Sequence, residues 1–199
     1  MQIRTFAAAC FVGGLMVTVG LRAAPDDARS RTPLSFRLVD SAGVVHTQDE
    51  FARSRAVVLF FITPDCPISQ GYIPEMNRLK GDYAAKGVTF FAVQSDMTTT
   101  DAELRAHVAE YRYQFPALID PRQSLIRHTG ATVTPETVVM SASGTVLYQG
   151  RIDNRIVSLG QKRPKATEFD LREALNAVLA GRPVPRPRTT AFGCIISRS

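Results

Sequence analysis

Cys66 is the residue in this chain whose setting most suits chemistry. It stands in the stretch FFITPDCPISQ, after an apolar run and before a segment with helical spacing. A cysteine at a helix N-terminus faces unpaired backbone N–H groups and the positive end of the helix dipole, which favour the thiolate. Pro67 suits the first helical turn, and Ser69 can donate a hydrogen bond to the sulfur. These residues predict an activated thiol.

Two features of the same stretch argue against an activated thiol. Asp65 precedes the cysteine, and a neighbouring carboxylate raises the pKa of a thiol. Free cysteine is also often buried, so an inert core residue is the alternative. The prolines on either side, Pro64 and Pro67, favour a turn at the surface.

The N-terminal residues predict export. Residues 1–24 begin with a positive charge, continue as an uncharged apolar run and end in RAA, as a secretory signal peptide does. An uncleaved membrane anchor and a buried helix are the alternatives. Cys10 lies in this segment, and residues 25–33 form a polar linker. In a periplasmic or other extracytoplasmic compartment, the remaining pair, Cys66 and Cys194, suggests disulfide or redox chemistry.

The net charge of +6 comes from the last quarter of the chain. Residues 151–199 hold 10 basic and 4 acidic side chains, whereas residues 1–150 hold 14 of each. Such a segment could contact nucleic acid or anionic lipid. Because its basic residues lie among prolines with few aromatic residues, we predict a solvated segment and no nucleic-acid partner.

The pattern of elements predicts the frame around Cys66. Apolar runs that alternate with helical spacing predict a parallel core, and the later hairpin adds antiparallel strands. We expect an α/β three-layer sandwich, a mixed sheet with helices on both faces. The expected strands are 34–40, 56–62, 88–95, 115–120 and a hairpin over 136–150; the expected helices are 67–85, 98–113, a turn over 121–130 and 167–181, the last capped by Thr167, with 151–166 irregular.

The chain resembles the thioredoxin fold, in particular exported redoxin proteins of the alkyl hydroperoxide reductase–TlpA group. Four features carry the resemblance: Cys66 between strand and helix, Pro74 eight residues later, VTPET at 133–137, and the closing hairpin VVMSASGTVLYQGRID. They imply a thioredoxin-like domain over 34–181, followed by a Pro/Arg-rich tail over 182–199.

The resemblance also implies site residues. Thr134 and a cis Pro135 would form the substrate groove with Pro67, although an ordinary trans proline is the alternative. The family pattern is CxxC, and here Ser69 replaces the second cysteine. Thr63 stands three residues before Cys66, as in peroxidatic sites, but Leu59 occupies the position of their proline. The substrate is therefore either a protein disulfide or a peroxide.

We expect Cys194 to take the role of the missing cysteine, by analogy with redoxins that carry a resolving cysteine on a returning tail. Residues 182–190 can span roughly 25–28 Å at about 3.1 Å per residue in an extended proline-rich conformation. We hypothesise that Cys66 attacks and that Cys194 resolves it or pairs with it as a disulfide. The alternatives are an unrelated tail cysteine and an intermolecular bridge.

Two functions from different classes follow. The first is an exported thiol-dependent oxidoreductase acting through Cys66, with Cys194, Ser69 and Thr63 in support and a possible membrane-associated redox partner. The second is a thioredoxin-fold binding or chaperone module that has lost the dithiol and holds a protein partner or copper, with His128 as a ligand beside the cysteines. We expect no cofactor, because the sequence has no nucleotide-binding motif.

Overall fold

The computed structural model describes residues 34–94 and 96–198. The predicted leader, 1–24, and linker, 25–33, lie outside these ranges. Within them, no helix combines the length and the apolar composition that a membrane span requires.

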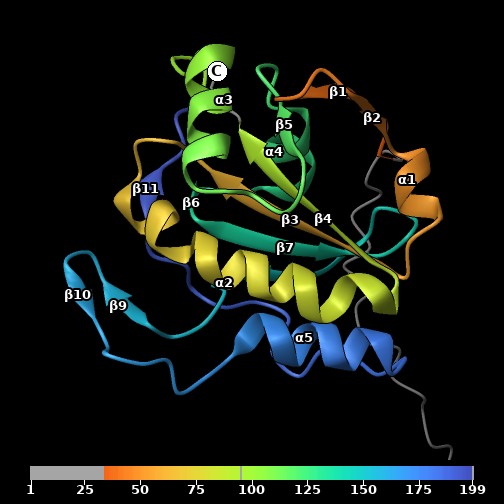
Figure 1. The fold of residues 1–199 in the computed structure, drawn as a ribbon. Coiled ribbons are helices and arrows are strands. Elements are labelled where there is room, and N and C mark those ends of the chain that lie inside the picture. The colour runs from red at the N-terminus through yellow and green to blue at the C-terminus, as the bar shows by residue number, and fades with distance from the viewer. Residues whose placement is uncertain (1–33, 95, 199) are drawn as a thin grey trace, which may run out of the picture. The chain divides into compact units, whose positions relative to one another are not determined.

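A seven-stranded mixed sheet forms the middle layer (Figure 1). Its order is β2-β1-β5-β4-β3-β7-β8, with β3, β4 and β5 parallel to one another and the other neighbours antiparallel. The strands are β1 Arg37–Asp40, β2 Val45–Thr47, β3 Ala56–Ile62, β4 Val88–Gln94, β5 Ala117–Ile119, β7 Glu136–Met140 and β8 Val146–Gly150.

The central strand β3 is buried along its whole length, as its apolar sequence predicts. Because side chains alternate along a strand, Val58 and Phe60 pack into the cluster on one face of the sheet, and Leu59 and Phe61 pack into the cluster on the other. This strand therefore holds the start of the next element, the helix after Cys66, on a rigid support.

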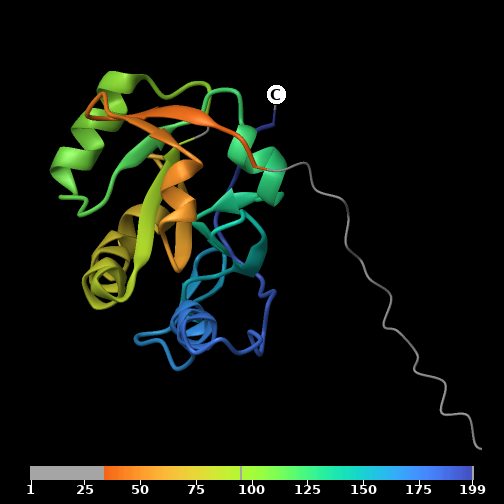
Figure 2. The same ribbon diagram turned by 90° about the vertical axis from the view of Figure 1, so that its right-hand side faces the viewer.

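Helices cover both faces of the sheet, which confirms the three-layer α/β fold. The turned view in Figure 2 looks almost along α2 and α5. The helices on one face contribute Met76, Leu104 and Leu175 to its cluster, and those on the other contribute Phe51 and Leu125. The first group comprises α2 Pro67–Tyr83, α3 Asp101–Glu110 and α5 Asp170–Leu179; the second comprises α1 Asp49–Ala52 and α4 Ser124–Thr129; a 3-10 turn, η1 Ala84–Lys86, follows α2.

The structure differs from the sequence prediction in three places. The segment 151–166 is not irregular throughout, because it contains the hairpin β9 Ile156–Ser158 and β10 Gln161–Lys162. The tail contains β11 Cys194–Ile195, which pairs with β6 Val133–Thr134. Thr167 does not cap α5, since the N-cap is Phe169 and Thr167 bonds to Asn154 instead.

Candidate functional site

Cys66 joins the rigid strand β3 to the helix α2. It is the N-cap of α2, with extended backbone angles and Pro67 in the first helical position. Its N–H donates to the Thr63 carbonyl, and its carbonyl accepts from the Gln70 N–H. The sequence therefore places this sulfur at the amino end of a 17-residue helix, where the backbone N–H groups favour an anion.

The surroundings of Cys66 lower the pKa of its thiol. Burial alone raises this pKa, but hydrogen bonds outweigh burial: first one from the Cys194 thiol, then those from the Ser69 backbone amide and the Thr134 side chain. In its protonated form the Cys66 thiol donates to the Thr134 carbonyl, with 3.0 Å between Sγ and O. The thiolate is thus supported from the helix, the loop and the tail.

Cys194 lies directly against Cys66. Its thiol donates to the Cys66 sulfur, and the two Sγ atoms are 2.6 Å apart, against about 2.05 Å in a disulfide bond. Both cysteines are free thiols in the structure. Burial, the hydrogen bond and charge at Cys66, and the Asp65 carboxylate raise the pKa of Cys194 to about 12. The pair is therefore asymmetric: Cys66 ionises first, and Cys194 holds its proton.

A two-residue strand delivers Cys194 to the site. In the antiparallel pair β11–β6, Cys194 stands opposite Thr134, and Figure 1 shows β11 beside β6. The Thr134–Pro135 peptide bond is cis. Gly193 passes so close to this loop that an added Cβ would lie 2.0 Å from the Thr134 carbonyl oxygen. Only glycine lets the tail approach at this point.

The rest of the tail is fastened along the domain. The Thr189 N–H donates to the Gln149 carbonyl of β8, and a Cβ at Gly150 would collide with Thr189. Farther back, the Arg186 guanidinium contacts three carboxylates, those of Glu168, Asp170 and Glu173. Part of the basic charge of this quarter is therefore engaged within the molecule.

The sequence predicted Cys66 at the surface of a turn, and this prediction is wrong, because its exposed fraction is 1%. The sulfur is not part of either apolar cluster of the sheet. Cys194 and Thr134 contact it directly, so part of its cover is the tail strand.

The other predicted residues surround the sulfur in different ways. The Ser69 hydroxyl is fully buried and makes no hydrogen bond of standard geometry with a described residue; its effect on the pKa of Cys66 is the smallest of those that lower it. The Thr63 hydroxyl pairs with the Thr134 hydroxyl at 3.1 Å, so it supports the cis-proline loop. Asp65 was expected to act on Cys66, but the pKa that it raises is that of Cys194.

Glu136 is a residue of the site that the sequence analysis missed. One carboxylate oxygen accepts from the Thr132 and Val133 N–H groups, and the other accepts from the Gln149 side chain. This buried carboxylate therefore fixes the loop that carries Thr134 and Pro135. The signal in the sequence was a charged residue at the first position of an otherwise apolar strand.

His128 does not join the two cysteines. Its Nε2 pairs with the Gly144 carbonyl at 2.8 Å. Among the described residues, no group of three or more histidine, cysteine, aspartate or glutamate side chains is arranged to hold a metal ion. The geometry thus gives the copper hypothesis no support.

Comparisons with known proteins place this geometry among redoxins. The model of the AhpC/TSA family matches residues 30–149. A curated relative, the thiol-disulfide oxidoreductase ResA of Bacillus thuringiensis (strain Al Hakam), is 30% identical over 97 residues, which are 49% of this chain and 55% of the relative. The chain thus spans about half the length of the curated relatives it matches.

Two solved structures resemble most of the described domain. The hypothetical protein SMc02350 from Sinorhizobium meliloti 1021 is 30% identical, with a TM-score of 0.71 over 84% of this chain and 93% of that one. An uncharacterized conserved protein from Geobacillus kaustophilus is 26% identical, with a TM-score of 0.70 over 84% of this chain and 91% of that one.

Proposed function

The chain belongs to the AhpC/TSA family, and on that premise we propose that it is a thiol–disulfide oxidoreductase in which Cys66 attacks and Cys194 resolves. The observation that carries the proposal is the 2.6 Å separation of the two sulfur atoms, which come from positions 128 residues apart. The relatives named ResA are thiol-disulfide oxidoreductases. Their activity supports a disulfide as the substrate.

The first step is attack by the Cys66 thiolate on one sulfur of a substrate disulfide. A bond forms between Cys66 Sγ and that sulfur, the substrate S–S bond breaks, and the other substrate sulfur leaves as a thiolate. The lowered pKa of Cys66 supplies the nucleophile. The backbone of Thr134, beside cis Pro135, pairs with the substrate in place of β11, a strand of two residues.

The second step is resolution by the tail. Cys194 loses its proton and attacks Cys66 Sγ, which breaks the mixed disulfide and releases the second substrate thiolate. The substrate has then gained two electrons, and the enzyme holds a Cys66–Cys194 disulfide. A dithiol reductant returns it to the free thiols. Since the pKa of Cys194 is about 12, this second attack requires a base or the departing thiolate to take the proton.

The remaining predicted residues have supporting roles in this proposal. Ser69 occupies the place of the second cysteine of a CxxC pair, so the resolving sulfur comes from the tail rather than from α2. Thr63 positions Thr134 through its hydroxyl. Pro67 begins the helix that stabilises the thiolate. Export, as residues 1–24 predict, places the disulfide in an oxidising compartment where it persists.

Thiol counting tests the proposal. The full-length chain with Cys10→Ser holds two thiols, and reaction with bis(2-hydroxyethyl) disulfide should consume both and release two equivalents of mercaptoethanol. A parallel reaction with hydrogen peroxide identifies the oxidant class: equal or faster consumption there would assign peroxide as the substrate. Two unreacted thiols in both reactions would leave the binding-module hypothesis instead.

A further inference from the structure

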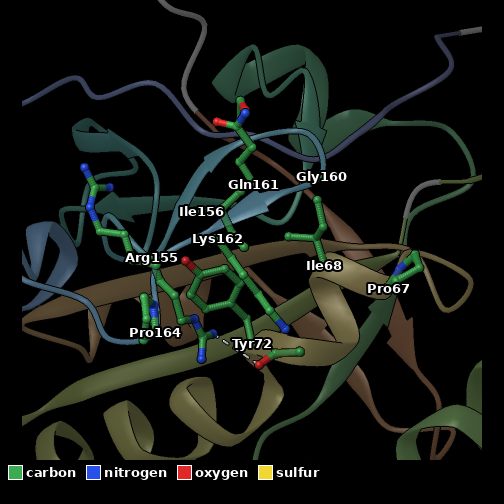
Figure 3. A pocket seen from close by; sticks show the side chains of 12 residues that line it. Pro67, Ile68, Tyr72, Arg155, Ile156, Gly160, Gln161, Lys162 and Pro164 are labelled. Carbon is green, nitrogen blue, oxygen red and sulfur yellow. Dashed lines mark hydrogen bonds between the residues drawn. The ribbon is translucent and has the colours of Figure 1, made fainter.

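A pocket of about 540 Å³ opens between the first turns of α2 and the hairpin β9–β10 (Figure 3). Its wall includes Pro67, the first residue of the helix whose N-cap is Cys66. Its volume falls in the range of pockets that bind ligands. Six of its lining residues supply positive charge or apolar surface: Ile68, Tyr72, Arg155, Ile156, Lys162 and Arg163.

The charge of this pocket is positive. Three of its lining residues, Arg155, Lys162 and Arg163, are cationic, and none of the described residues that line it is acidic. The Arg155 guanidinium lies 4.3 Å from the centre of the Tyr72 ring and donates to the Gly71 carbonyl (Figure 3). Asp153, beneath the pocket, accepts from the Tyr72 hydroxyl at 2.5 Å.

The Lys162 ammonium has no partner in the part of the chain that the structure describes. No hydrogen bond or ion pair to this group is present there, and in Figure 3 its side chain extends toward the ribbon of α2. Arg155 and Arg163 donate to the backbone carbonyls of Gly71 and Asn154, not to carboxylates. Other basic residues of the domain differ: Arg151 and Arg172 each contact two carboxylates. The positive charge of the pocket is therefore not neutralised by an ion pair within the described residues.

The pocket is also apolar in part, and the hairpin that forms one of its walls exposes further apolar side chains. Ile68, Ile156 and the Tyr72 ring line the inside. On the same hairpin but outside the pocket, Val157 is 37% exposed and Leu159, at the turn, is 68% exposed. A pocket and a hairpin that together present cationic and apolar groups suit a polypeptide segment that carries both carboxylates and apolar side chains.

We propose that the pocket and the hairpin β9–β10 bind an acidic, partly apolar segment of the protein whose disulfide Cys66 attacks. The inference rests on the proposed function for the identity of that protein, because the pocket lies at the first turn of the helix whose N-cap is Cys66. Charge complementarity with Lys162 and Arg155 selects the acidic segment. The apolar side chains contact Ile68, Ile156 and Leu159.

Fluorescence anisotropy with two labelled peptides tests this inference without redox chemistry. Both have serine in place of cysteine and share apolar residues, and they differ only in flanking glutamates or flanking lysines. The full-length chain should bind the acidic peptide at least tenfold more tightly. Lys162→Glu should weaken that binding about tenfold. Lys165→Glu, the same charge change on an exposed residue outside the pocket, should change it less than twofold.

Three results would overturn the inference: equal binding of the two peptides, equal losses in the two lysine variants, or full displacement of the acidic peptide by citrate, a small carboxylate without sulfur, at a concentration that fills a small-molecule site. Since the peptides carry no thiol, failure of disulfide exchange by the unmodified chain would overturn the proposed function alone. The two failures are therefore distinguishable.

Discussion

The two sulfur atoms of the site come from regions of opposite character. Cys66 stands between β3, a fully buried seven-residue strand, and the 17-residue helix α2. Cys194 stands on β11, a strand of two residues beside the exposed Ile195. The pKa of the first thiol is lowered, and that of the second is raised to about 12.

This difference shows how the two thiols of a redox pair can be divided between the core and a peripheral strand. In the proposed mechanism, the attacking thiol of Cys66 is held by the core, where strand, helix and loop fix its geometry and favour its anion. The resolving thiol of Cys194 then lies on β11, a strand that we propose the substrate replaces. Each of the following variants alters one of these two regions.

Removal of the fixed sulfur should have the largest effect. Cys66→Ser replaces the nucleophile by a hydroxyl, and disulfide exchange with bis(2-hydroxyethyl) disulfide should fall about a thousandfold or more. The far-UV circular dichroism spectrum should stay unchanged, because a serine fills nearly the same volume. Appreciable turnover by this variant would show that Cys194, and not Cys66, is the attacking thiol.

Removal of the tail sulfur should have the next largest effect. Cys194→Ala keeps the first attack but loses resolution, so steady-state turnover should fall about a hundredfold. The mixed disulfide of Cys66 with the substrate should accumulate, and intact-mass spectrometry should detect it as a stoichiometric adduct. Unchanged turnover would show that an external thiol resolves Cys66 and that the tail is dispensable.

Displacement of β11 without loss of the Cys194 sulfur should have an intermediate effect on the rate of disulfide formation. Gly193→Ala places a Cβ 2.0 Å from the Thr134 carbonyl oxygen, so β11 must shift. Formation of the intramolecular disulfide, followed by quenched-flow alkylation, should slow about tenfold. The matched control is Gly81→Ala in α2, where an added Cβ meets no atom within 4 Å. Equal rates in the two alanine variants would contradict the close fit of the tail.

The pH dependence should show the smallest change. Thiolate absorbance at 240 nm rises as pH passes a thiol pKa, and Cys66 should titrate below the pKa of an ordinary cysteine. Cys194 should contribute only toward pH 12. In Cys194→Ala the hydrogen bond to Cys66 is lost, so its titration should move to higher pH. A midpoint that stays in place would mean that the tail does not tune Cys66.

The sequence predicted the sheet and helices around Cys66 far better than the tail strand β11 that carries Cys194. The bounds of β3 follow from an unbroken apolar run, and the cap of α3 follows from local chemistry, since Thr100 and Glu103, three residues apart, form a capping box. Both depend on residues close together in the chain. The same is true of the order of strands and helices that indicated a thioredoxin-like sheet.

What the sequence could not predict depends on distant partners. Cys194 covers part of Cys66, and only the resemblance to redoxins with a cysteine on a returning tail indicated that contact, since no local pattern records it. The strands β9, β10 and β11 are two or three residues long and largely exposed, so they leave no apolar alternation to detect. Thr167 looked like a helix cap, but Asn154, 13 residues earlier, takes its hydrogen bonds.

Disulfide mapping tests the central claim most directly. After one equivalent of disulfide substrate, blocking of free thiols and trypsin digestion without reductant, residues 56–78 hold Cys66 and residues 189–198 hold Cys194. The account predicts one linked species of these two peptides, from protein that migrates as a monomer on a non-reducing gel. Recovery of both peptides with blocked thiols, or a link between two copies of the same peptide, would contradict it.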